Sequence, residues 1–214
     1  MSGVPDSPEG IDAAWLTDAL ALRHPGARVA RVEVVERHEA TNQHARLRVV
    51  YDEPAGCPET LFCKLLPSKP GTRAAIAATG MGLREALFYE RLADRLAMRT
   101  PVVHVARCDE GSGAFVLLLE ALQARGGTGP DGPLGVAPEA AARALEDLAE
   151  LHLRFLDPAV RAREAGWVRP PDPPSDYGVT RLRYGLEHHR ERLSGPFAEL
   201  AELSVAKRDA VHAA

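Results

Sequence analysis

Lysine and cysteine are scarce in this chain of 214 residues, and long apolar runs are missing. Of the 26 basic residues, Lys64, Lys69 and Lys207 are the only lysines. The three cysteines are widely spaced and form no Cys-x-x-Cys pair, which argues against a disulfide framework and against a structural zinc site. No apolar run approaches the roughly 18 residues that a membrane span needs, so we expect no membrane span.

The charge balance is slightly acidic, with 26 Lys and Arg against 30 Asp and Glu and a formal net charge of -4. This balance argues against nucleic acid as a partner of the whole domain. The first residues have neither a basic start nor an apolar segment, so we expect no signal peptide and a cytoplasmic location. Composition alone does not choose among an enzyme, a binding module and a scaffold.

The hydrophobic pattern predicts an α+β chain, with strands in the first part and helices in the second. Apolar residues at helical spacing predict a leading helix over 11–22 and a further helix over 83–96. Residues 67–80 are expected to be a loop with room for a short alanine-rich helix. Five stretches with strand alternation are expected to form one antiparallel sheet: 29–35, 44–51, 60–66, 101–106 and 114–119.

A segment rich in Gly and Pro at 126–138 is the clearest change of composition in the chain. We therefore predict an N-terminal lobe over 1–123, a linker over 124–137 and a helical part over 138–214. The helical part is expected to contain three helices, at 138–155, 180–193 and 197–212.

Lys64 is the first candidate site residue because it interrupts the apolar strand 60–66. Strand alternation places its side chain on one face together with Phe62 and Leu66. A buried ammonium group needs a partner, because an unpaired buried charge is costly. The alternative is an edge lysine whose head group reaches water.

Glu85 is the second candidate because it lies on the apolar stripe of the predicted helix 83–96. The stripe consists of Phe88, Tyr89, Leu92 and Leu96. A glutamate on the helix and Lys64 on the preceding strand, both facing one core, predict an ion pair. Such a pair can be purely structural, or it can orient the lysine toward nucleotide phosphates as in kinase-type folds.

Five segments then carry a resemblance to a known superfamily. They are the strand around Lys64, Arg84-Glu85-Ala86-Leu87-Phe88-Tyr89-Glu90-Arg91-Leu92, Arg99-Thr100-Pro101, the stretch 115–122, and Leu148-Ala149-Glu150-Leu151-His152. Together they resemble the aminoglycoside phosphotransferase superfamily, and within it the bacterial phosphotransferases related to ecdysteroid and choline kinases. The resemblance implies a protein-kinase-like N-lobe, made of a five-stranded antiparallel sheet and one packed helix, followed by a partial helical C-lobe.

The resemblance assigns a role to several residues. It implies that Lys64 contacts the α- and β-phosphates of ATP and that Glu85 holds this lysine in place. The backbone from Glu120 to Leu122 is implied to be the hinge that forms hydrogen bonds with adenine.

Thr41 and Asn42 fall in the loop that covers the phosphates in the superfamily. This loop departs from the family pattern, because Glu39 and Ala40 stand where a glycine usually lets backbone amides approach a phosphate. Thr41 and Asn42 can therefore also be interpreted as ordinary turn residues.

A second departure is the lack of a catalytic loop. Phosphoryl transfer needs an aspartate that receives the hydroxyl proton and further ligands that hold magnesium. The superfamily supplies the aspartate in a His-x-Asp motif, but none of the four histidines after the linker has an aspartate two positions later: His152, His188, His189 and His212. We therefore assign no catalytic residue and no metal ligand. Mg²⁺ is expected for the family, and ATP binding by this chain is expected to be weak.

The sequence thus predicts a kinase-like phosphotransferase that stops before the catalytic loop and is inactive alone. A truncated gene product, a shortened paralogue and a fragment all fit this pattern. The substrate implied by the resemblance is a small molecule with a hydroxyl group, which the sequence does not identify further. The alternative functions are a pseudokinase-like module that binds a nucleotide or a protein, and a structural remnant without a ligand.

Overall fold

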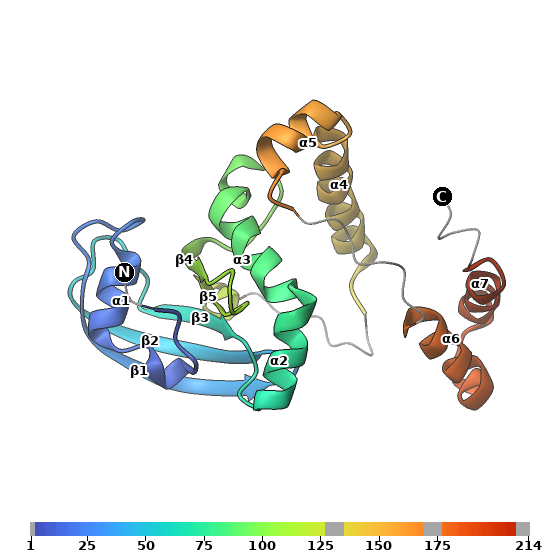
Figure 1. Cartoon of the computed structure of the whole chain (residues 1–214), viewed down its shortest axis with the longest axis horizontal. Coiled ribbons are helices and arrows are strands. Elements are labelled where there is room, and N and C mark those ends of the chain that lie inside the picture. Colours follow the sequence, from blue (N-terminus) through green and yellow to red (C-terminus); the bar gives the residue numbers. More distant parts are fainter. Residues whose placement is uncertain (1–2, 127–134, 169–176, 209–214) are drawn as a thin grey trace. The chain divides into compact units, whose positions relative to one another are not determined.

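A computed structural model describes residues 3–126, 135–168 and 177–208 (Figure 1). The chain divides into two compact units, Met1–Trp167 and Val168–Ala214. Most of the predicted linker 124–137 and the last residues of the predicted helix 197–212 lie outside the described residues.

Five strands form a single sheet in the first unit, with the order β1-β2-β3-β5-β4. Every pair of neighbouring strands is antiparallel, so the predicted five-stranded antiparallel sheet is confirmed. The strands are β1 (Arg28–Glu39), β2 (Gln43–Glu53), β3 (Thr60–Leu65), β4 (Val103–Cys108) and β5 (Phe115–Glu120).

The described residues also contain seven α-helices. In the first unit they are α1 (Ala13–Leu20), α2 (Pro70–Thr79), α3 (Met81–Arg91), α4 (Pro138–Arg154) and α5 (Pro158–Ala165). The second unit contains α6 (Tyr177–His188) and α7 (Gly195–Ala206), which pack against each other. No helix within the described ranges combines the length and apolar character that crossing a membrane requires.

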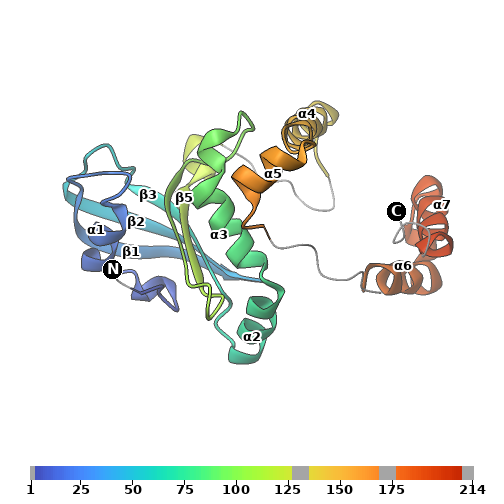
Figure 2. The same cartoon turned by 45° about the horizontal axis from the view of Figure 1, so that its top comes forward.

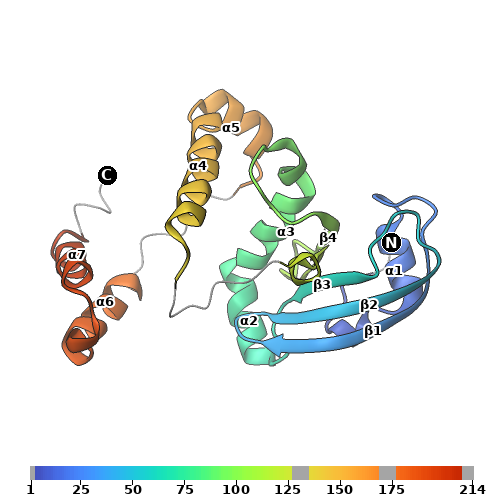
Figure 3. The ribbon, with the colours of Figure 1, turned by 180° about the vertical axis from the view of Figure 1, so that it is seen from behind.

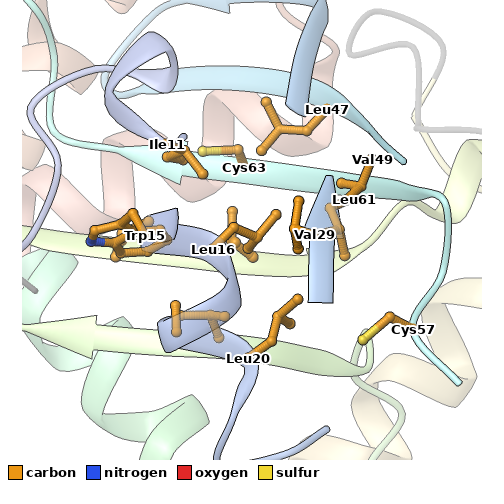
Figure 4. Close-up of a cluster of buried hydrophobic side chains, with 14 of the residues drawn as sticks. Ile11, Trp15, Leu16, Leu20, Val29, Leu47, Val49, Cys57, Leu61 and Cys63 are labelled. Carbon is orange, nitrogen blue, oxygen red and sulfur yellow. The ribbon is translucent and has the colours of Figure 1, made fainter. Parts of the chain in front are cut away.

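One face of the sheet is covered by α1. This helix begins where the Asp12 side chain accepts a hydrogen bond from the Trp15 backbone N–H at 2.7 Å, an N-cap that satisfies one of the otherwise unpaired first amides. Its apolar side then packs on the sheet and closes a continuous core (Figure 4). That core includes Leu16 and Leu20 of α1 and Leu47, Leu61, Cys63 and Val116 of the strands.

The opposite face is covered in part by α3, and Figure 2 shows α1 and α3 on either side of the sheet. Alternate residues of β5 divide between the two faces, as the period of a strand requires. Val116 and Leu118 join the α1 side. The cluster on the α3 side contains Leu66, Ala86, Val103, Phe115, Leu117 and Leu119.

The segment between β3 and β4 differs in part from the prediction. Residues 67–80 were expected to be a loop with room for a short alanine-rich helix, and Pro70–Thr79 forms that helix, α2. Gly80 separates it from α3 with a left-handed φ of 64°. The predicted helix 83–96 begins earlier and ends earlier, because Leu92 leaves the helical conformation at φ -126°.

The buried side of α3 is therefore shifted relative to the predicted stripe. It consists of Gly82, Leu83, Ala86 and Leu87. Glu85 remains next to this buried side, whereas Phe88 and Tyr89 are only partly buried.

The first hairpin is longer than predicted, because β1 and β2 extend almost to its tip (Figure 3). The register between them shifts between Val34 and Glu36. Such an irregularity changes which residues of β1 point to a given face. As a result, both Glu33 and Glu36 lie opposite arginines of β2, Arg48 and Arg46, on the face away from α1.

Arg99 connects the first part of the chain to α4 within the same unit. Its guanidinium donates to both carboxylate oxygens of Asp147 at 2.9 Å, and also to the Arg143 carbonyl at 2.8 Å. A two-pronged pair of this kind fixes orientation better than a single contact does. The pair also holds the pKa of the Asp147 carboxyl below its usual value.

Candidate functional site

Lys64 and Glu85 meet at the interface between β3 and α3. The distance between Lys64 Nζ and Glu85 Oε2 is 2.6 Å, so the predicted ion pair is confirmed. The side chains are 19% and 34% exposed, which places the pair at the edge of the α3 cluster, where a ligand can reach it. An ammonium group has three N–H donors, and Glu85 is the one acceptor that the described residues supply.

Strand alternation explains why Lys64 reaches this position. Its neighbours Cys63 and Leu65 are fully buried on the α1 side, so Lys64 and Phe62 necessarily face α3. Lys64 lies opposite Leu117 of β5, which belongs to the α3 cluster. The lysine therefore has apolar packing on one flank and the Glu85 carboxylate above it.

His44 lies beside the ion pair, and the sequence prediction did not identify it as a candidate. It lies directly opposite Lys64 in the register of β2 and β3, and its ring is 5.5 Å from the Phe62 ring. The pKa of His44 is lower than its usual value of 6.5, mainly because the ring is partly buried and, to a smaller extent, because the Lys64 charge is close. Two alternating strands in the sequence indicate that His44 has a cross-strand partner, but not which residue that partner is.

The predicted hinge follows directly from the end of β5. The Glu120 backbone N–H donates to the Val102 carbonyl at 2.8 Å, and its carboxylate accepts from the Val102 N–H at 3.2 Å. Ala121 is buried, and Leu122, 46% exposed, begins a short 3-10 turn. The first amide of such a turn has no acceptor within the turn itself.

Thr41 and Asn42 form the tip of the first hairpin, where the Ala40 N–H donates to the Asn42 carbonyl at 3.1 Å. Thr41 is exposed, whereas Asn42 is only 7% exposed. The Asn42 Oδ1 atom is buried and has no hydrogen-bond partner among the described residues.

The tip is tied to the connection between β3 and α2. Glu39 accepts hydrogen bonds from the Ser68 hydroxyl at 2.7 Å and from the Ser68 backbone N–H at 3.1 Å. These bonds lower the pKa of the Glu39 carboxyl. Glu39 thus has a structural partner at the place where the superfamily's loop usually has a glycine.

The strand register places these features on two sides of Lys64. Leu61 pairs with Glu120, so the hinge lies three residues along β3 from Lys64, roughly 10 Å away at the rise of a strand. In the other direction, Leu65 pairs with Gln43, next to Asn42. The structure therefore brings Lys64 and Glu85 into contact, and it places the predicted hinge residues 120–122 and the hairpin tip on opposite sides of them along the strands.

No cluster of three or more potential metal ligands occurs among the His, Cys, Asp and Glu residues within the described ranges. Comparison with models of protein families, with curated proteins and with solved structures gives no match for this chain. The likeness to the phosphotransferase superfamily therefore depends on the sequence segments described above.

Proposed function

We propose that the sheet and α3 form the nucleotide-binding lobe of a kinase-like phosphotransferase fold, and that its ligand is ATP. The observation that carries this proposal is the 2.6 Å contact between Lys64 of the third strand and Glu85 of α3, the second helix after that strand. In protein kinases a lysine of the third strand contacts nucleotide phosphates, and a glutamate of the next helix holds it. Here the same two residue types occupy the third strand and α3, with α2 between these two elements in the chain.

Three further features support the proposal. The order of elements, three strands, helices and two more strands, is the order that the resemblance implies. Glu120 to Leu122 follow the strand next to β3, where a backbone can contact adenine. The hairpin tip with Thr41 and Asn42 lies on the other side of Lys64, toward which the phosphates would extend.

We further propose that this chain alone binds the nucleotide without transferring phosphate. Transfer requires a carboxylate that accepts the hydroxyl proton and carboxylate or amide ligands for Mg²⁺. The sequence from 126 to the last residue contains no His-x-Asp motif. In the superfamily that the chain resembles, these groups belong to the helical lobe, together with the residues that select a small-molecule hydroxyl.

Thermal unfolding with and without ATP tests the binding proposal. At an ATP concentration ten times the dissociation constant, we expect about 1.4 kcal/mol of stabilisation, or a rise in Tm of roughly 3 °C. Lys64→Ala should abolish this rise. Lys207→Ala, which removes an exposed lysine from the end of α7, should leave it unchanged and is the matched control.

A coupled assay of ADP release over a panel of hydroxylated compounds tests the second statement. We expect no turnover above background for the wild-type chain. Steady turnover that disappears in Lys64→Ala would show that a carboxylate of this chain acts as the base, and the statement would then be wrong. If ATP neither raises Tm nor is turned over, the chain is better described as a structural remnant without a ligand.

A further inference from the structure

A row of basic side chains crosses three neighbouring strands on the face that carries Lys64. His38 of β1 lies opposite His44 of β2, and His44 lies opposite Lys64 of β3. Residues that are directly opposite in antiparallel strands point to the same face of the sheet. The three groups therefore lie side by side, with a strand spacing of about 4.8 Å between neighbours.

Two other pairs between β1 and β2 on this face have opposite charges, whereas Arg31 lies opposite Val50. Glu33 pairs with Arg48 at 3.4 Å, and Glu36 pairs with Arg46 at 3.0 Å. This is the arrangement expected for an exposed sheet surface, because like charges directly opposite each other are destabilising. The row that contains Lys64 departs from it.

Within the described residues, Glu85 is the one carboxylate in contact with the row, and it binds Lys64. His38 and His44 have no carboxylate partner there. The row that contains Lys64 therefore lacks the charge pairing across β1 and β2 that the next two rows have, and it borders the hairpin tip. A local excess of basic groups with this geometry suits an anionic ligand with several charged oxygens.

We propose that His38, His44 and Lys64 bind a polyphosphate group, and that His44 takes up a proton when the polyphosphate binds. The row spans about 10 Å across three strands, enough for the phosphates of a nucleoside di- or triphosphate. This inference rests on the proposed function above in one respect only: it takes ATP as the source of the polyphosphate. The row itself recognises the polyphosphate, with or without a nucleoside.

The sign of the pH dependence follows from the groups that face His44. His38 on β1, Lys64 on β3 and Arg46 two residues along β2 are basic, and Glu85 on α3 is acidic. Partial burial and the Lys64 charge keep the pKa of His44 below 6.5, so its ring is mainly neutral at neutral pH. A bound polyanion favours the protonated ring, which raises this pKa. Affinity therefore increases as the pH falls toward the pKa of the free protein.

Isothermal titration of the full chain with inorganic tripolyphosphate, from about pH 8 to about pH 5.5, tests the proposal over the range in which histidine titrates. The ligand also titrates, so the informative quantity is the difference between variants. We expect the affinity of the wild type to rise more steeply than that of His44→Gln, by up to about tenfold per pH unit for one linked proton. His188→Gln, which changes a histidine 56% exposed on α6, should match the wild type.

Titrations in two buffers of different ionisation enthalpy count the protons taken up on binding. We expect a larger uptake by the wild type than by His44→Gln, and a smaller change in the same direction for the exposed His38→Gln. If His44→Gln does not fold, His38→Gln provides the same test. Equal pH slopes and equal proton uptake in the wild type and the folded variants would overturn the proposal.

Parallel titrations with ATP and adenosine separate this proposal from the proposed function. ATP binding could depend on Lys64 and have the same pH slope in His44→Gln as in the wild type. That result would overturn the polyphosphate proposal for the basic row and support the nucleotide-binding proposal. Tripolyphosphate binding that depends on His44, with no adenosine binding and no higher affinity for ATP than for tripolyphosphate, would support the polyphosphate proposal. It would overturn the proposal that this lobe binds a nucleotide.

Discussion

The two faces of the sheet are built by the same five strands, but they are covered to different extents. The face toward α1 is apolar from β1 to β4 and is closed by Trp15, Leu16 and Leu20. The face toward α3 is apolar over β4 and β5 and carries charged and imidazole groups over β1 and β2. The first face buries the larger set of apolar side chains, whose burial stabilises the fold, and the second leaves polar groups partly exposed.

Two consecutive residues of β3 show the contrast most sharply. Cys63 points to the α1 side, where it is fully buried and burial raises the pKa of its thiol to about 12. Lys64 points to the α3 side, where it is partly exposed and paired with Glu85. A thiol with so high a pKa is unreactive at neutral pH, whereas a partly exposed lysine can bind an anion.

The largest loss of stability should come from a cavity on the face of the sheet that α1 covers. Leu16 is fully buried in α1, so Leu16→Ala should lower the free energy of unfolding by about 2–5 kcal/mol. Leu22→Ala, just beyond the same helix at a position that is 89% exposed, should change it by less than about 0.5 kcal/mol. Urea denaturation of both variants measures the difference. Similar effects would mean that α1 does not pack on the sheet as described.

A smaller loss of stability is expected at the contact between α3 and the Phe115 ring of β5. A Cβ atom at Gly82 would lie 2.1 Å from the Phe115 ring, so Gly82→Ala should force a shift of α3 and destabilise the fold by about 1–3 kcal/mol. Gly71→Ala in α2 is the control, because nothing lies within 4 Å of the added atom. That variant should be neutral or stabilised by up to about 1 kcal/mol in denaturant unfolding.

The shift of α3 should also disturb the ion pair. If Gly82→Ala were as stable as Gly71→Ala, the contact between α3 and Phe115 would be wrong, and so would the support that it gives to Glu85.

The ion pair itself should contribute less than the packing around it. Lys64 and Glu85 are 19% and 34% exposed, so solvent screens part of their attraction. A double-mutant cycle with Lys64→Met and Glu85→Gln should give a coupling free energy of about 1 kcal/mol in denaturant unfolding. Coupling indistinguishable from zero would contradict the short contact between the two head groups.

The smallest effect should be a pH dependence without ligand. The pKa of His44 is lower in the folded state than its usual 6.5, so the unfolded chain binds more protons as the pH falls through that value. The wild type should therefore lose stability between about pH 7.5 and pH 5.5, and His44→Gln should lose less. Thermal unfolding of both proteins at about pH 7.5 and at about pH 5.5 measures the difference. If the wild type gained stability at the lower pH relative to His44→Gln, the predicted direction would be wrong.

The sequence was sufficient to predict the sheet and the Lys64–Glu85 pair, because both depend on local periodicity. Alternation in 60–66 identifies which residues share the face of Lys64, and helical spacing puts Glu85 near the core. The division of the whole chain into a strand part and a helical part also follows from such patterns. The predicted core stripe on α3 was wrong, because the stripe changes with the residue at which the helix starts.

The missed features depend on partners that are distant in sequence or on weak local signals. The pairing of His44 with Lys64 is a matter of register between strands, and the shift near Val34 brings His38 into the same row. Helix α5 is only eight residues long and has too few apolar residues to form the stripe that identifies a helix. For α5 a signal was present, since Asp157 caps its first turn and Pro158 follows.

The most direct test asks whether the face of the sheet that carries Lys64 binds ATP, as we propose. Amide chemical shifts of the isotope-labelled chain, recorded with and without ATP, report this residue by residue. We predict the largest changes around His44, Lys64 and Leu122, with small changes in α1, and we predict that adenosine perturbs the Leu122 region but not His44. Changes concentrated in α1 or in α6 and α7, with none near Lys64, would contradict the central claim.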